Sequence, residues 1–487
     1  MKKLSYIIVS GLLLLNSCSK GFLDEFPPQN ITSGNYYQTE KQMVTAANSV
    51  YSQLYNIWGN GSLPYIYGDL YGGDSWLYLF VGTASDWEDL GNRKSLFPAN
   101  GTITGAWKSY YTGIFKVNDF LVELEKFGDK FTTPGLGLRM KGEALFIRAS
   151  FYYYLTECFG NVPLVSKVLT TSEAIGLTQD TKAIVVAKMI EDLQFAISNL
   201  PESYVAAEVG HITKYAAKAM LARVYMANNM NTEAKAQLKD IIDSGKYSLD
   251  TDNNGVTNPN DFDNLFNVAT KNTKESILEN QYIKGVTGFY HDYAQQFTPR
   301  LSGFHFPGLT QSIEAWGNGA VRDSLYFDFE ANDIVRRDIS AQMYVTIGGV
   351  PKYCPNTAKY YWKTTETLYI GSNVHVIRYA EVLLNYAELT NDATYLNMVR
   401  TRAGLPGWGQ AGYPTAKYPT LALAIEHERR VELSFEFQRG FDLKRTGRLI
   451  DVVKKMTGIT LTADRTLFPI PQSVLDVNTK ITQNKGY

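Results

Sequence analysis

Apolar residues recur at steps of three and four between residues 142 and 159, at Ala144, Ile147, Phe151, Leu155 and Cys158. Residues at this spacing lie on one face of an α-helix. Gly160 and Pro163 mark its end, because glycine adopts the left-handed conformation that closes a helix and proline prevents the helix from resuming. Arg148 lies on the same face, and a buried arginine needs a carboxylate partner. We therefore expect a buried central helix whose arginine pairs with a carboxylate from another helix.

The same periodicity predicts helices over residues 40–55, 107–126, 185–200, 215–227, 232–242, 374–390 and 421–437. Small and large apolar residues alternate through residues 219–234, as in tetratricopeptide helix pairs, although the strict period of about 34 residues is absent. Between residues 246 and 373 the helical signal fades, and one short strand is expected at 276–282. These patterns predict a mainly α fold, in which a tetratricopeptide-like scaffold of helix pairs carries a large loop-rich excursion with few short strands.

Two segments rich in aromatic residues, 63–100 and 284–329, lack helical periodicity. We expect the first to be a long loop, and loops of this length are normally functional or disordered. Its many aromatic residues argue against disorder. Large apolar side chains without a core-facing period either pack beneath their own loop or are available to a ligand. We expect more than half of these rings to pack beneath their own loop.

The N-terminus combines Lys2 and Lys3 with an apolar run over residues 4–15 that is too short to span a membrane comfortably. This arrangement is typical of a secretory signal peptide, here residues 1–17. Cys18 follows at the end of the apolar run, in the position that bacterial lipoproteins acylate. Residues 18–30 would then form a lipidated tether, because two or more acyl chains anchor a protein stably. The alternative is an ordinary signal peptide with an incidental cysteine.

Composition narrows the classes of function. The chain has 487 residues, and its formal net charge of -1 provides no basic surface for nucleic acid. Apart from Cys18, the cysteines are Cys158 and Cys354, which form neither a disulfide framework nor a metal-ligand set. Cys158 falls on the buried stripe and is expected to be a small core residue.

Several motifs, in this order, resemble the SusD/RagB family. They are Gly142-Glu143-Ala144 with Arg148-Ala149, Tyr152-Tyr153 and Phe159-Gly160-Asn161-Val162-Pro163; Ile377-Arg378-Tyr379-Ala380-Glu381; Glu428-Arg429 with Glu432, Arg439 and Asp442-Leu443-Lys444-Arg445; and Phe468-Pro469-Ile470-Pro471 with the closing residues. Two departures are Thr446, where the family usually has tryptophan, and Lys485, where it usually has proline. Both departures look structural.

The resemblance implies a surface lipoprotein of Bacteroidota, anchored in the outer membrane, that binds nutrients for a SusC-like TonB-dependent barrel. It implies an N-terminal helical part over residues 31–245 and a C-terminal part over 246–487. The second part divides into the excursion, 246–373, and closing helices, 374–487. Acidic residues just after Cys18, Asp24 and Glu25, resemble the signal that directs such lipoproteins to the cell surface.

One motif in the excursion follows the ligand spacing of a calcium loop. Asp250, Asp252 and Asn254 occupy positions one, three and five, glycine follows at six, and Asp261 stands at position twelve. Aspartate at position twelve is shorter than the usual glutamate, which would lower the affinity. The alternative is a solvated polar turn, because clusters of these residues are common in loops. No cofactor is expected to be required, and a structural Ca²⁺ in this loop is the one candidate ion.

No catalytic motif is found, so we expect a protein that is not an enzyme. His427-Glu428 opens like a zinc-protease helix, but the residue four after His427 is Val431. Residues 428–445 form a dense charged run, which is either a catalytic or anion site or a network of paired charges that locks the last helices together. We favour the network, with Arg148 as one partner, because unpaired buried charge is costly.

Two classes of function fit. One is capture of an oligosaccharide or polysaccharide for the transporter; the other is an oligopeptide binder or helical-repeat adaptor. Flat aromatic rings with a polar rim favour glycan, whereas peptide capture favours an exposed sheet edge or apolar groove. The expected stacking residues, chosen for their small or polar neighbours, are Trp76, Trp87, Tyr290 and Trp316. Secondary ligand contacts are expected from Asp74, Phe304, His305 and Asn318.

Overall fold

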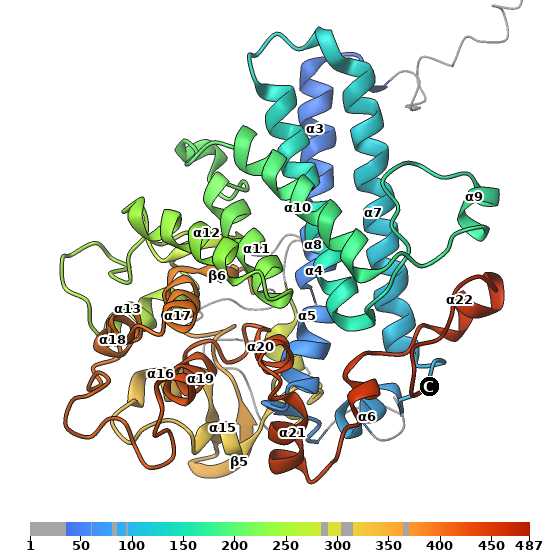
Figure 1. Cartoon of the computed structure of the whole chain (residues 1–487). Helices are drawn as coiled ribbons and strands as arrows, with labels where there is room; N and C mark the ends of the chain where they lie inside the picture. Colours follow the sequence, from blue (N-terminus) through green and yellow to red (C-terminus); the bar gives the residue numbers. More distant parts are fainter. Residues whose placement is uncertain are drawn as a thin grey trace, which may run out of the picture.

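The computed structural model describes residues 36–59, 61–79, 85–93, 96–283, 291–302, 315–363 and 370–487. The predicted mainly α architecture is confirmed. A column of long helices stands above a broader part that contains the strands and the C-terminal helices (Figure 1). No helix within these ranges is long and apolar enough to cross a membrane.

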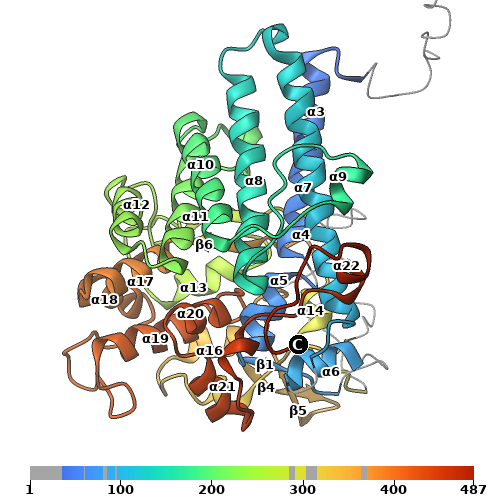
Figure 2. The same cartoon turned by 45° about the vertical axis from the view of Figure 1, so that its right-hand side comes forward.

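The column is built from the N-terminal helices α3 (Glu40–Tyr51), α4 (Gln53–Trp58), α7 (Gly101–Phe127) and α8 (Leu136–Phe159). The turned view shows α3, α7 and α8 side by side along much of their length (Figure 2). Gly113 of α7 allows the close approach, since a Cβ there would lie 2.1 Å from the ring of Phe151 on α8. The helix predicted around residues 142–159 is therefore confirmed, and its position is central.

Almost every residue of α8 from Glu143 onward is buried. Arg148 pairs with Asp192 of α10 (Lys182–Asn199), with Nε–Oδ2 and Nη2–Oδ1 distances of 2.8 Å, and Nη1 also donates to Asn118 Oδ1 of α7. The expected carboxylate from another helix is confirmed. The prediction that Arg148 pairs with the C-terminal charged run is wrong. Helix α10 packs directly against α8, and its Asp192 is the carboxylate that pairs with Arg148.

Helix pairs continue from α10 through α11 (Lys214–Ala227) and α12 (Asn231–Asp243). The next member of the array is α17 (Tyr379–Thr390), which packs against α12 although it lies more than a hundred residues later. Helix α18 (Ala393–Arg402) packs in turn against α17. The excursion is thus inserted between two neighbouring members of one helical array. Cys158 is free and buried, which confirms its prediction as a core residue, and Cys354 is also free and buried.

The described part of residues 63–100 is not the long loop that was predicted. It contains α5 (Leu63–Tyr65), the π-helix η2 (Ile66–Tyr71) and α6 (Ser85–Asn92). The wider turn of a π-helix does not produce the spacing of an α-helix, which explains the missing periodicity. Tyr65, Tyr67 and Tyr71 are buried core residues. Gly68 lets η2 approach the backbone of Phe437, since a Cβ at Gly68 would lie 2.2 Å from the Phe437 carbonyl oxygen.

The strands of the described residues form three two-stranded antiparallel sheets, each with at least one strand from the excursion. They pair β1 (Ser75–Trp76) with β3 (Ala320–Val321), β2 (Ser276–Asn280) with β6 (Val374–Arg378), and β4 (Gln342–Ile347) with β5 (Val350–Asn356). The strand expected at 276–282 is confirmed, whereas the first five residues of the helix predicted from residue 374 form β6. Short helices fill the remainder: α13 (Pro259–Phe266), α14 (Tyr293–Gln296), α15 (Asp323–Tyr326) and α16 (Ile334–Ser340).

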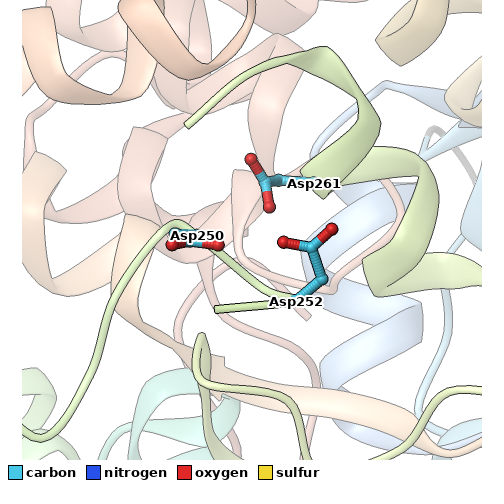
Figure 3. Close-up of side chains that lie close together, drawn as sticks. All are labelled: Asp250, Asp252 and Asp261. Atoms are coloured by element: carbon cyan, nitrogen blue, oxygen red, sulfur yellow. The ribbon is translucent and has the colours of Figure 1, made fainter. Parts of the chain in front are cut away.

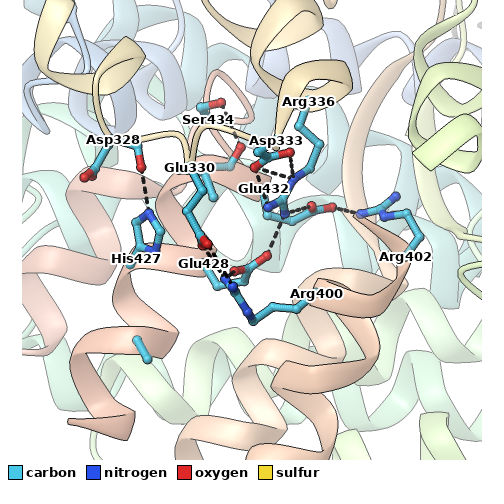
Figure 4. A network of polar contacts seen from close by, with 12 residues as sticks. Asp328, Glu330, Asp333, Arg336, Arg400, Arg402, His427, Glu428, Glu432 and Ser434 are labelled. Carbon is cyan, nitrogen blue, oxygen red and sulfur yellow. Dashed lines mark hydrogen bonds and ion pairs between the residues drawn. The ribbon is translucent and has the colours of Figure 1, made fainter. Parts of the chain in front are cut away.

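The chain closes with α19 (Leu421–Glu432), α20 (Arg439–Arg445), α21 (Leu449–Thr457) and α22 (Gln472–Val477). Glu432 is fully buried and accepts from Arg336 at 2.8 Å, from Arg378 at 2.5 Å and from Arg402. Glu428, one turn earlier, joins Arg336 to Arg400 (Figure 4). The predicted network of paired charges is confirmed, and it ties α16, β6 and α18 to α19.

Candidate functional site

The two aromatic-rich segments meet where β1 pairs with β3. Ser75 lies opposite Val321 in this strand pair, and Trp76 Nε1 donates to the Val321 carbonyl at 3.0 Å. Beyond the strand, Tyr78 N donates to the Gly317 carbonyl at 3.0 Å. Residues 75–78 of the first segment and 317–321 of the second therefore lie side by side.

A row of aromatic side chains starts at this junction and crosses onto the hairpin β4–β5. Trp76 stacks on Tyr78 with centroids 5.1 Å apart and an interplanar angle of 26°. Tyr78 meets Tyr353 edge to face at 5.3 Å, and Tyr353 meets Tyr344 at 5.8 Å. Tyr344 is 64% exposed and the other three are partly exposed. We call these residues the aromatic ladder.

Charged groups border the ladder. The Arg322 guanidinium carbon lies 5.7 Å from the centre of the Trp76 ring, and Nε donates to the Gly73 carbonyl at 2.9 Å. The Tyr353 hydroxyl donates to Asp323 Oδ1 at 2.5 Å. Burial, and then the Asp323 carboxylate, raise the pKa of Tyr353, so its phenol stays neutral and remains a hydrogen-bond donor. Flat partly exposed rings with a charged rim can bind a ligand that has one apolar face and polar edges.

Two of the predicted stacking residues lie near this region in different environments. Trp316 is partly exposed and immediately precedes Gly317, and its backbone N–H donates to the Gln295 carbonyl at 2.7 Å. Trp87 lies on α6, where its partly exposed ring packs on Tyr65 with centroids 5.9 Å apart. Stacking of a ligand on either residue stays a prediction.

Two of the predicted secondary contacts are buried. Asp74 is fully buried and forms an ion pair of 2.7 Å with Arg430 of α19, so its carboxylate serves the interior and not a ligand. Asn318 is also buried, and its backbone carbonyl accepts from the Tyr65 hydroxyl at 2.5 Å. These two assignments are corrected, because small polar neighbours in the sequence do not reveal whether the backbone is packed inside.

The other predicted ligand residues, Tyr290, Phe304 and His305, lie outside the residues that the structure describes, as does the lipidation residue Cys18.

Tyr344 and Tyr353 were missed in the sequence, although a signal for their hairpin was present. Gly348 and Gly349 both have positive φ, at 57° and 78°, and link β4 to β5. A Gly-Gly pair between runs of β-branched and aromatic residues predicts a two-residue hairpin turn. In that hairpin Tyr344 lies directly opposite Tyr353, which places both rings on one face.

The predicted calcium loop brings its carboxylates together. Oxygen atoms of Asp250, Asp252 and Asp261 lie within 4.8 Å of one another, and Figure 3 shows the three side chains converging. Asp261 is buried near the start of α13, where Oδ1 accepts from the Thr251 N–H at 2.7 Å and Oδ2 accepts from the Asn258 N–H at 2.8 Å.

The loop also satisfies its other carboxylates internally. Asp250 accepts from the N–H groups of Asn254 and Gly255 at 3.1 and 2.8 Å. Burial raises the pKa of Asp250, but these hydrogen bonds outweigh it and hold the pKa below its usual value. The Asn254 side chain donates to Asp252 and its Oδ1 accepts from Val256 N, so this oxygen does not point at the carboxylates. Calcium binding stays a prediction.

Comparison with known proteins gives consistent similarities. A family model described as "SusD family" matches residues 336–487, and one described as "Starch-binding associating with outer membrane" matches residues 22–226. The chain is 26% identical to SusD-like protein P2 of Formosa agariphila, over 91% of each sequence. It is 24% identical to a SusD-like protein of Bacteroides ovatus, over 91% of this chain and 82% of that protein.

Solved structures show the same fold. The structure of a laminarin-binding SusD-like protein matches with a TM-score of 0.75 and 25% identity, covering 93% of this chain and all of that one. Surface glycan-binding protein A from Bacteroides thetaiotaomicron, in complex with laminarihexaose, matches with a TM-score of 0.73 and 22% identity, over 92% of this chain and all of that one.

Proposed function

Because the chain belongs to the SusD/RagB family, we propose that it is a cell-surface lipoprotein that captures an oligosaccharide or polysaccharide. It then passes the glycan to a partner TonB-dependent outer-membrane transporter. The lipid anchor is Cys18, followed by the tether to residue 30. A family model named for association with the outer membrane supports this location.

The observation that carries the proposal is the aromatic ladder. A pyranose ring has one apolar C–H face and a rim of hydroxyl groups, so it packs on an aromatic ring while charged groups at the edge accept and donate hydrogen bonds. Trp76 and Tyr78 already form a stacked pair with Arg322 beside it. Tyr344 offers the most exposed ring of the ladder. Successive rings would bind successive sugars of a chain.

The relatives indicate which glycans to test first. One protein of the same fold is described as laminarin-binding, and another was solved in complex with laminarihexaose. Titration calorimetry with these and with other neutral polysaccharides would be performed on the wild type, Trp76→Ala and Tyr344→Ala. A stacked ring contributes about 1–3 kcal/mol, by analogy with aromatic hot spots and base stacking. Each substitution should therefore weaken binding roughly tenfold or more.

The matched control is Phe115→Ala, which removes another exposed aromatic ring, on α7. It should bind glycan like the wild type, and all variants should keep the wild-type melting temperature. Ladder variants that bind every tested glycan like the wild type, or that lose binding only by unfolding, would refute the ladder as the binding surface.

A further inference from the structure

A cavity lies among the C-terminal helices and shares no residue with the aromatic ladder. Its volume is about 270 Å³, and it is bordered by α17, α19, α20 and the chain just before α21. Ala422, Leu423 and Leu443 form its apolar wall, and several arginines provide its polar side. A cavity of this size is slightly below the range of drug-sized ligand sites and fits a ligand of about one sugar ring.

Two of the arginines are fully matched by carboxylates. Asp442 lies 2.6 Å from Arg429 and 2.9 Å from Arg445, and Arg445 also pairs with Glu388. Burial raises the pKa of Asp442, but Arg429 and Arg445 outweigh it and hold the pKa below its usual value. The carboxylate therefore stays ionised, and this half of the cavity is electrically balanced.

The other half has an excess of positive charge. Arg439 and Arg448 share the single carboxylate of Glu426, at N–O distances of 3.3 and 3.0 Å. Arg439 is only 8% exposed, and among the described residues its Nε has no hydrogen-bond partner. A buried donor without an acceptor is unfavourable, so Arg439 has unmet hydrogen-bonding capacity beside the cavity. The side chain of Arg448 is 42% exposed, which places it within reach of solvent.

We propose that this cavity binds the carboxylate of a small organic acid about the size of one sugar ring, such as a hexuronate. Arg439 and Arg448 donate to the carboxylate, because the planar guanidinium fork matches its two oxygens. The body of the ligand packs against Leu423 and Leu443. An inorganic oxyanion has no apolar body to use that wall. The site is independent of glycan binding at the ladder.

The test is ligand-observed NMR titration of the full-length protein with glucuronate and galacturonate, beside glucose, galactose and inorganic sulfate. The uronates should bind and the neutral sugars should not. Arg439→Gln should weaken uronate binding at least tenfold. Glu426→Gln should strengthen it several-fold, because that substitution removes the carboxylate that competes for both arginines. A merely structural role for these residues would not produce a gain.

Arg337→Gln on α16 is the control, since Arg337 lies on the surface beside Asp338 and away from this cavity. It should leave uronate binding unchanged. If Arg439→Gln does not fold, Arg448→Gln replaces it, because that side chain is half exposed. The proposal is overturned if neutral sugars bind as well as uronates, if sulfate binds as tightly as uronates, or if Glu426→Gln gives no gain. Loss of ladder binding would leave these results unchanged, so the two proposals fail separately.

Discussion

Glu432→Gln tests whether the buried charge network holds the C-terminal helices in place. The substitution keeps the shape of the side chain but removes a fully buried carboxylate that faces Arg336, Arg378 and Arg402. Three guanidinium groups would then be left with less negative charge around them. Breaking a buried ion pair by removing one partner costs about 3–5 kcal/mol. Typical domains have a free energy of unfolding of about 5–15 kcal/mol, so the expected loss is a large part of the total.

The pH dependence of the free energy of unfolding provides an independent test of the same network. Burial raises the pKa of Glu432, but Arg402, Arg378 and Arg336 together hold it well below its usual value. A carboxyl group with a lowered pKa in the folded state contributes stability above its unfolded pKa, about 4.3, and loses that contribution as the pH falls towards its folded pKa. The difference between wild type and Glu432→Gln should therefore be constant above pH 5 and shrink only in strong acid.

The assay is denaturant unfolding followed by circular dichroism at pH 7 and at several acidic values. The control is Asp243→Asn, which breaks the exposed Lys239–Asp243 pair on α12 and should cause no measurable change. If Glu432→Gln is no more destabilising than this control, the buried charge network does not hold the C-terminal helices in place.

Three further predictions concern other parts of the chain. Cys18→Ala should remove the protein from the cell surface, and equal protease shaving of variant and wild type on intact cells would refute the anchor. Calcium should raise the melting temperature, and Asp250→Ala should abolish that rise; a melting temperature unaffected by calcium or chelator would assign the loop to a plain turn. Asp69→Asn should stabilise the protein by about 1–3 kcal/mol at neutral pH, because among the described residues the fully buried carboxylate has no hydrogen-bond partner of normal geometry. Burial and then Asp74 raise the pKa of Asp69, so wild-type stability should fall as the pH rises above the unfolded value of about 3.9. Denaturant titration should show this fall reduced in Asp69→Asn, and an unchanged profile would contradict it.

The helical scaffold could be predicted because its signals are local. The stripe through Ala144 and Phe151 defined α8, and a buried Arg148 required a carboxylate nearby. Which carboxylate it was depended on helix packing, so the assignment to the C-terminal run was wrong. The π-helix at 66–71 was missed because its turns do not repeat at α-helical spacing.

The candidate site was predicted only in part, since it is assembled from distant segments. Trp76 could be chosen as an aromatic residue with polar neighbours. Tyr353, which contacts Tyr78 in the same row of rings, lies on a hairpin that reaches this row only through tertiary packing. Asp74 has similar neighbours in the sequence and is nevertheless buried against Arg430. Local composition does not distinguish a residue beside a ligand surface from one beneath it.

A crystal structure of the protein with a bound oligosaccharide would show whether the aromatic ladder binds sugar rings. Laminarihexaose is the first ligand to use. We expect sugar rings packed against the faces of Trp76, Tyr78 or Tyr344, with a hydroxyl group within hydrogen-bond distance of Arg322 or Asp323. An oligosaccharide bound on another surface, or an extended peptide bound where sugars are not, would contradict it.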